Sequence, residues 1–169
     1  MKFRPRKRIS TILLSLLLFA VVCVTALGAI ATPALAEDYT KESLVGVDFS
    51  GKVLTDASFT KANLRSSNLS NTDLSGVSFF GANLESANLE GANLRNATLD
   101  TARITRANLT NAVLEGAFAV YTKFEGAIID GADFTDVLLR PDVQKTLCKV
   151  AKGKNPVTGR ETRETLGCP

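Results

Sequence analysis

Every fifth residue from Leu44 to Leu139 is apolar, and this register holds for twenty consecutive positions without an insertion or deletion. Twelve of these central residues are Leu, five are Phe, two are Ile, and one is Ala119. A period of five is neither the period of about 3.6 residues of an α-helix nor the two-residue period of a β-strand. A fixed internal period of this kind is typical of a solenoid, in which successive repeats stack on one another.

A second position follows the same rhythm, because a small residue lies two positions before each central residue. Ala occupies this position in twelve repeats and Val, Ser or Thr in six, so that only Glu42 and Lys52 depart from the pattern. Residues two apart on an extended backbone point to the same side, and both are therefore expected to form the core. The other positions are rich in Asn, Asp, Ser and Thr, and eight repeats end in Gly, which tolerates the positive φ of a turn.

This pattern resembles the pentapeptide-repeat family, whose repeat reads A(D/N)LXX. The units that match it are AlaAsnLeu at 62–64, 82–84, 87–89, 92–94 and 107–109, and AlaAspPhe at 132–134. The resemblance covers residues 42–141 and implies an all-β solenoid, a right-handed quadrilateral β-helix with four repeats per coil. Twenty repeats then give about five coils. We expect a signal peptide over 1–36, the β-helix over 37–141, and a helical C-terminal cap over 142–169.

The first 36 residues are typical of a secretory signal peptide. Basic residues between Lys2 and Arg8 precede an apolar run from Ile12 to about Ile30, and Ala34-Leu35-Ala36 gives a small-x-small cleavage pattern. Cleavage would leave Glu37 as the mature N-terminus, and the chain would meet a membrane only through this segment before cleavage. The alternative is an uncleaved anchor, because the apolar run is nearly long enough to span a bilayer.

Removing this segment changes the charge of the chain. The whole sequence has 20 basic and 17 acidic residues, but five basic and no acidic residues lie in 1–36, which leaves a net charge of −2. The family resembled includes acidic rods that mimic DNA. Duplex DNA carries about one charge per 1.7 Å, so a rod of roughly 24 Å would need on the order of fourteen negative charges. The charge and the export signal therefore argue against a nucleic-acid partner.

The five-residue period stops at Pro141. Apolar residues at 143, 147, 150 and 151 have helical spacing and predict a helix over 142–151, and a second short helix is predicted over 158–166. An open solenoid end exposes core residues and unpaired strand edges. We expect the two helices to cover this end over Phe134, Leu138 and Leu139.

Two cysteines follow residue 36, Cys148 and Cys168. An even number of cysteines in an exported chain indicates one disulfide, with free thiols or a redox-responsive pair as the alternatives. Their spacing is not the CxxC of an oxidoreductase. Residues 148–169 are similar to the C-terminal cap of lumenal pentapeptide-repeat proteins of cyanobacteria and chloroplasts. This resemblance implies the thylakoid lumen, with the periplasm as the alternative.

Several common catalytic and cofactor-binding arrangements are excluded by the sequence. The chain has no His, so a Ser-His-Asp or Cys-His arrangement and imidazole metal sites are excluded. Two cysteines cannot form a four-ligand zinc site, and no glycine-rich phosphate motif is present. Carboxylates such as Asp130 and Asp133 lie at outward positions and are expected to be solvated. We therefore predict no catalytic residue, no metal and no cofactor.

Ala119 is the one small residue at a central position, and its repeat reads AlaPheAlaValTyr at 117–121. With twenty residues per coil, Ala119 stacks between Leu99 and Leu139. Large side chains then gather on the outside of this wall: Phe80, Phe118, Val120, Tyr121 and Leu138. An exposed apolar patch marks an interaction site. Either the C-terminal helices fold back over the patch, or part of it, around Phe80 and Tyr121, docks a protein partner.

The sequence thus predicts a non-enzymatic exported protein that serves as a structural or protein-interaction module in the thylakoid lumen. The partner and the oligomeric state are not identified by the sequence. The alternative is a redox-responsive regulatory protein that switches through a Cys148–Cys168 disulfide.

Overall fold

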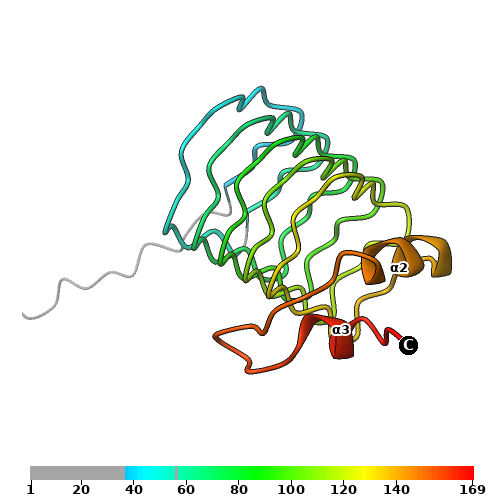
Figure 1. Cartoon of the computed structure of the whole chain (residues 1–169). Helices are drawn as coiled ribbons and strands as arrows, with labels where there is room; N and C mark the ends of the chain where they lie inside the picture. The colour runs from blue at the N-terminus through cyan, green and yellow to red at the C-terminus, as the bar shows by residue number, and fades with distance from the viewer. Residues whose placement is uncertain (1–36, 56) are drawn as a thin grey trace, which may run out of the picture. The chain divides into compact units, whose positions relative to one another are not determined.

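The computed structural model describes residues 37–55 and 57–169, which fall in one compact unit, Ala36–Pro169. The predicted signal peptide over 1–36 lies outside the described residues. Figure 1 shows a stack of coils, coloured from cyan to yellow, that is followed by two short helices and a connecting loop.

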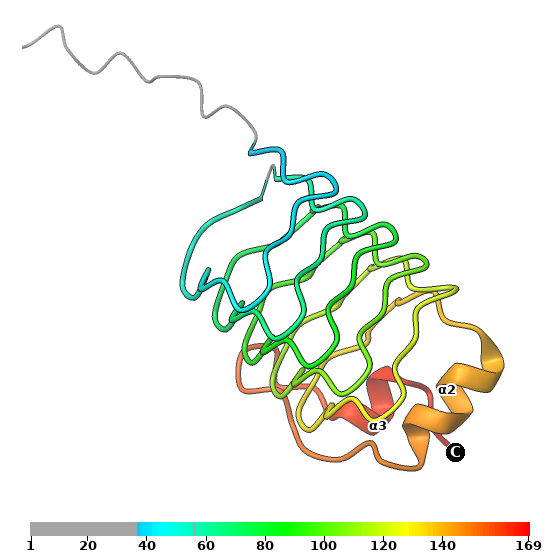
Figure 2. The same cartoon turned by 90° about the horizontal axis from the view of Figure 1, so that it is seen from above.

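The coils are twenty residues long, because parallel β-bridges join residues that are twenty apart. Seventeen such bridges span the described repeats, from Asp38–Ser58 to Phe118–Leu138. Each bridge is a single residue between turns, so each wall of a coil is a short rung and not a strand of several residues. The chain turns after every rung, and four rungs close each coil into a quadrilateral (Figure 2).

Backbone hydrogen bonds run along the stack in both directions. The N–H of Leu94 donates to Val113 O in the next coil at 2.7 Å, while the N–H of Asn93 donates to Thr72 O in the coil before at 3.0 Å. A third bond, from Ala97 N–H to Leu94 O at 3.1 Å, closes the turn. Since each rung is satisfied by its neighbours, one repeat cannot fold alone.

The last residue of almost every repeat has a left-handed backbone conformation. Between residues 41 and 136, eighteen repeat ends have φ between 55° and 72°, and Tyr121 is the exception among the described ones. An Asn or Asp on the rung supports the turn, as when Asn93 Oδ1 accepts the N–H of Arg95 at 3.4 Å. This bond explains why Asn and Asp recur before the central residue.

The predicted core is confirmed. Every central residue from Phe49 to Phe134 is buried, whereas Leu44 and Leu139 at the two ends are half-buried. The register also extends one repeat further than expected, to Tyr39. The Tyr39 ring stacks on Phe59 at 4.9 Å between centroids, and Phe59 stacks on Phe79 at 5.2 Å.

Two helices follow the coils, α2 (Pro141–Cys148) and α3 (Thr162–Thr165). Helix α2 ends at Cys148 and not at the predicted residue 151, and it begins at Pro141 and not at residue 142. The first N–H groups of a helix have no partner within it, so the missing N–H of proline does not destabilise this position. The second spans four residues instead of 158–166, because the preceding segment forms an antiparallel bridge between Lys154 and Glu161.

Both helices lie at the C-terminal end of the stack (Figure 1). Leu147, Ala151 and Leu166 join the hydrophobic core. The prediction that the helices cover Leu138 is wrong, because this side chain is 51% exposed. Helix α2 lies instead beside the wall of Phe124, where Phe124 and Ala127 line a hollow together with Val143 of the helix.

Candidate functional site

The predicted apolar patch lies on the wall that carries Ala119. Phe118 and Leu138 form the last rung pair of this wall and are 49% and 51% exposed. The same ladder is polar in the earlier coils, where Ser58, Ser78 and Thr98 are paired in sequence. Tyr121 is 59% exposed and Val120 is half-buried beside it. Four of the five predicted residues therefore come together.

Phe80 stands apart from the other four. It is 40% exposed, but Asp100 occupies the same position in the coil between Phe80 and Val120. Phe80 thus lies two coil spacings from Val120, which is about 10 Å along the stack. The C-terminal helices do not cover the patch, so the interpretation that they fold back over it is wrong.

Tyr121 ends its repeat with an altered turn. In a regular repeat, the N–H at this position donates to the next coil, as Gly116 does to Thr135 O at 2.9 Å. The N–H of Tyr121 donates to Asp100 Oδ1 at 3.1 Å instead. The chain leaves the register at Arg140 and Pro141 to form α2, so the carbonyl of a next coil is not the acceptor here. The side chain of Asp100, in the preceding coil, accepts the bond in its place.

Cys148 and Cys168 form a disulfide that ties the end of α2 to the C-terminus, with a Cα–Cα distance of 5.5 Å. Arg163 reinforces this link, since its guanidinium donates to Cys148 O and to Pro169 O at 2.9 Å each. Gln144 adds a bond from its amide to Leu166 O at 2.5 Å. Both cysteines are half-buried, and Lys145, Lys149 and Arg163 line the groove beside Cys148.

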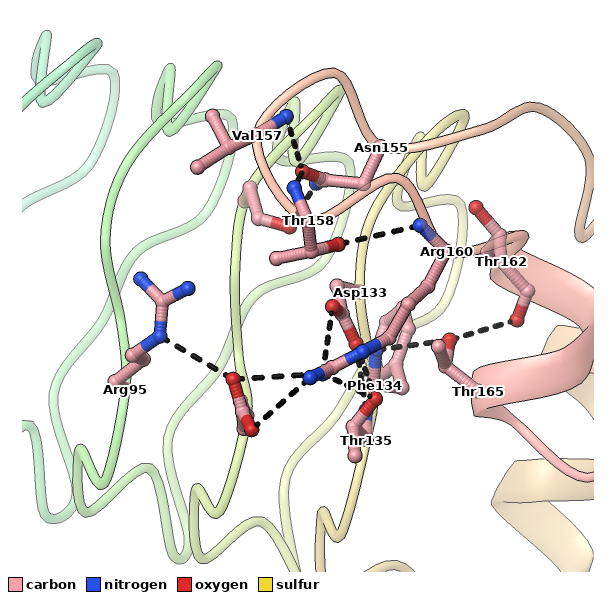
Figure 3. A network of polar contacts seen from close by, with 12 residues as sticks. Arg95, Asp133, Phe134, Thr135, Asn155, Val157, Thr158, Arg160, Thr162 and Thr165 are labelled. Atoms are coloured by element: carbon pink, nitrogen blue, oxygen red, sulfur yellow. Dashed lines mark hydrogen bonds and ion pairs between the residues drawn. The ribbon is translucent and has the colours of Figure 1, made fainter.

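A polar network joins the loop between α2 and α3 to the wall that ends at Phe134 (Figure 3). Arg160 Nη1 lies 3.2 Å from Asp133 Oδ2 and 3.4 Å from Glu115 Oε2, and it donates to Thr135 Oγ1 at 2.9 Å. Arg95 extends the network to the coil before through Glu115 at 3.3 Å. Sequence reasoning missed Arg160, which lies in a segment without a period.

Asp133 is fully buried, so the prediction that it is solvated is wrong. The loop of Arg160 covers it, whereas Asp130 keeps an exposed pair with Lys152 at 3.2 Å. Burial favours the neutral carboxyl of Asp133. Hydrogen bonds from Thr135 and Thr158 and the charge of Arg160 outweigh this effect, and the pKa of Asp133 lies below its ordinary value.

Asn155 anchors the same loop at the corner of the last coil. Its fully buried amide donates to Gly131 O at 2.8 Å, to Asn111 O at 3.1 Å and to Ala112 O at 3.3 Å. Its Oδ1 accepts the N–H groups of Val157 and Thr158 at 2.9 and 3.0 Å. One side chain therefore fastens the loop to two coils (Figure 3).

Clusters of metal ligands and long apolar helices were sought in residues 37–55 and 57–169. Within these ranges, no three His, Cys, Asp or Glu side chains gather closely enough to hold a metal ion. The helices in these ranges are too short or too polar to cross a membrane.

Two curated relatives are thylakoid lumenal proteins of Arabidopsis thaliana. The chain is 60% identical over 47 residues to the chloroplastic thylakoid lumenal 15 kDa protein 1, a match that covers 28% of this chain and 21% of the relative. It is 51% identical over 43 residues to the chloroplastic thylakoid lumenal protein TL20.3, which covers 25% and 15%. The chain thus spans about a fifth or less of the length of these relatives.

Solved structures give longer matches. A pentapeptide repeat protein from the A. thaliana thylakoid lumen is 50% identical with a TM-score of 0.73, over 75% of this chain and 88% of that one. A pentapeptide repeat protein from Nostoc Pcc 7120 is 24% identical with a TM-score of 0.51, over 62% and 85%, and shows the shared fold. These neighbours confirm the right-handed quadrilateral β-helix, and the lumenal relatives confirm the thylakoid lumen as the location. The protein-family model described as the pentapeptide repeat region matches residues 47–134, which is more than half of the sequence. The chain therefore belongs to the pentapeptide repeat family.

Proposed function

We propose that this chain is a non-enzymatic protein-interaction module of the thylakoid lumen, and that it docks a protein partner through the apolar patch. The patch is here defined as Phe118, Val120, Tyr121 and Leu138. The observation that carries the proposal is the change along one ladder from Ser and Thr to two half-exposed apolar side chains, Phe118 and Leu138. Contiguous exposed apolar surface on a soluble protein is typical of an interaction site.

The scaffold supports the patch in a fixed position. Ala119 beneath it is fully buried, and the backbone of Phe118 and Leu138 is bonded to Ala97 O at 3.0 Å and to Ala117 O at 3.1 Å. The two side chains therefore stand on a rigid ladder and not on a loop. A partner would not have to order this surface on binding, which lowers the entropic cost of association.

Charged substitutions on the patch are expected to abolish binding. The variant Phe118→Glu with Leu138→Glu should capture no partner from thylakoid lumen extract, whereas the native chain captures one that mass spectrometry identifies. Binding of the identified, purified partner is then measured by calorimetry. Because both side chains point outward, the melting temperature of the variant should stay close to that of the native chain.

Ile128 provides the matched control, since it occupies the same rung position on another wall and is 51% exposed. Ile128→Glu should bind the partner as the native chain does. Equal loss of binding in both variants would indicate a general effect of surface charge and would contradict the proposal. Retained binding by the patch variant would also contradict it.

A second candidate function is redox regulation through the Cys148–Cys168 disulfide. It is favoured by the basic groove of Lys145, Lys149 and Arg163, because nearby positive charge favours the thiolate and so speeds thiol exchange. Alkylation of thylakoids under reducing and oxidising conditions, followed by mass spectrometry, tests this. A regulator should show the bond opening and closing, and a bond that stays oxidised in both conditions excludes the role.

We also propose that the β-helix comprises about five coils between residues 37 and 141, and that residues 142–169 serve as its C-terminal cap. Bridges spaced by twenty residues support the coil number. The entry of Leu147, Ala151 and Leu166 into the core supports the role of the cap, because an uncovered end would leave core residues in water.

A further inference from the structure

We infer that the N-terminal edge of the β-helix is a surface able to pair with a second copy of this chain, and that Glu42 and Lys52 block this pairing. The edge is the first coil, whose rungs are Asp38, Ser43, Asp48 and Val53. Its backbone, its apolar side chains and its two inward charges support the inference separately.

Among the described residues, no group bonds to the outer side of the backbone at three rungs of the first coil. The N–H groups of Ser43, Asp48 and Val53 have no hydrogen-bond partner among the described residues, whereas the equivalent N–H of Asn63 donates to Glu42 O at 2.8 Å. The carbonyls of the same three residues likewise accept no bond from the described chain. An unpaired edge of this kind is a template for another chain.

The pattern of the free groups favours a second copy as the partner. Each of these rung residues presents its N–H and its C=O on the same side. Two such residues that face each other in antiparallel strands exchange both hydrogen bonds. A second copy, turned over about a two-fold axis, offers this arrangement on each of its rungs, and a two-fold interface uses the same surface twice.

The C-terminal edge does not offer the same surface. The N–H of Gly131 donates to Lys152 O at 2.9 Å, and the N–H of Phe134 donates to Thr165 Oγ1 at 3.0 Å. The loop and α3 thus occupy that end of the stack. Among the described residues, the C-terminal edge is therefore partly occupied, and a second N-terminal edge is the better match.

The first coil also leaves apolar surface in water. Val53 is 74% exposed, Val45 is exposed, and Leu44 and Val47 are half-buried although they continue the core. Pairing of two edges would bury the inward side chains of Leu44 and Val47, so both the backbone and these apolar groups favour association.

Glu42 and Lys52 oppose that association. They occupy the inward position that small residues fill in the other repeats, and both lie in the first coil. Both are exposed, and Lys52 Nζ lies 5.2 Å from the centre of the Phe49 ring at the end of the core. Two edges that met would enclose these charges between two apolar cores, and burial of charge without hydration is costly. Charged residues at inward positions are one way in which natural sheets avoid edge pairing.

The test uses a double variant, Glu42→Ala with Lys52→Ala, which places the small residue of the repeat at both positions. This double variant and the native chain are purified after export, and mass spectrometry identifies their N-termini. Sedimentation velocity over a range of concentrations should give a monomer for the native chain and a mass twice as large for the variant. Lys123→Ala with Glu125→Ala is the matched control, since it removes one exposed charge of each sign from a later coil, and it should stay monomeric.

Hydrogen exchange locates the interface. The amides of Ser43, Asp48 and Val53 should become protected in the associated variant and stay unprotected in the control. Val53→Lys added to the double variant should restore the monomer, because lysine on an edge opposes pairing.

Several outcomes would overturn the inference. They are a native chain that already pairs through this edge, a folded double variant that stays monomeric, and association that protects other amides. If the double variant does not fold, Glu42→Ala alone and Lys52→Ala alone are measured in the same way. Two folded single variants that both remain monomeric at every concentration would also overturn it.

Discussion

Replacement of Asn155 by Ala is expected to lower the free energy of unfolding by about 3 kcal/mol, a large effect for one polar side chain. The amide of Asn155 is fully buried and is the donor for Gly131 O and Asn111 O, which accept no backbone N–H among the described residues. Its loss leaves these carbonyls buried without a partner. It also frees the N–H groups of Val157 and Thr158 from their acceptor. Urea unfolding followed by circular dichroism measures the change.

Two further variants separate the causes of this loss. Asn155→Asp keeps the shape and the acceptor for Val157 and Thr158 but places a carboxylate oxygen against the carbonyls, so its loss should be at least as large. Asn83→Ala removes a half-buried Asn from a rung and should cost only about 0.5 kcal/mol, since water can replace its bonds. A well-tolerated Asn155→Asp would show that donation to the carbonyls does not hold the loop.

The coils could be predicted from the sequence because the period constrains every residue within them. Counting by fives identified the inward residues, and counting by twenties placed Phe118 beside Leu138. Tyr39 also fits this register, and its position five residues before Leu44 was the available signal for the earlier start. The structure could not be predicted from the period where the chain leaves the register. Nothing in the register indicates that the N–H of Tyr121 bonds to the side chain of Asp100.

The end of the stack was only partly predictable. The cysteine count indicated the disulfide, and the apolar spacing indicated α2. Asn155 and Arg160 gave no signal, because the coil residues that they contact lie more than twenty residues away in sequence and the loop between them has no period. For the same reason, the burial of Asp133 could not be read from its outward position in the repeat.

Replacement of Arg160 by Met is expected to lower the free energy of unfolding by about 2 kcal/mol at neutral pH. Removal of the cation leaves the buried carboxylate of Asp133 with hydrogen bonds but without an opposite charge. The loss should be smaller than for a fully buried pair, because the Arg160 side chain is 42% exposed and solvent screens its charge. The thioether chain of Met retains most of the packing of the arginine stem.

Asp133→Asn shows whether the effect of Arg160 depends on the carboxylate. Asn is common on the rungs, and the amide oxygen of the substituted side chain can still accept the N–H of Thr135, as the native carboxylate does at 2.9 Å. In this background, Arg160→Met should cost about 1 kcal/mol less than in the native chain. An equal cost in both backgrounds would mean that Arg160 acts through Glu115 or through packing alone.

The pH dependence of the same variants gives an independent measurement. The pKa of Asp133 is lower in the folded chain than in the unfolded one, so its ionised form stabilises the fold above the ordinary pKa of Asp. This stabilisation is lost as the pH falls through the folded pKa. In Arg160→Met, the hydrogen bonds of Thr135 and Thr158 still lower the pKa of Asp133, but the smaller contribution of the arginine charge is lost. The pKa of Asp133 therefore rises, and stability should begin to fall at a higher pH than in the native chain. Unfolding titrations from about pH 3 to pH 7 measure this shift. Relative to Asp133→Asn, the native chain should lose stability only in the acid part of this range. Curves of stability against pH that superimpose at acid pH for the native chain and Arg160→Met would contradict the prediction.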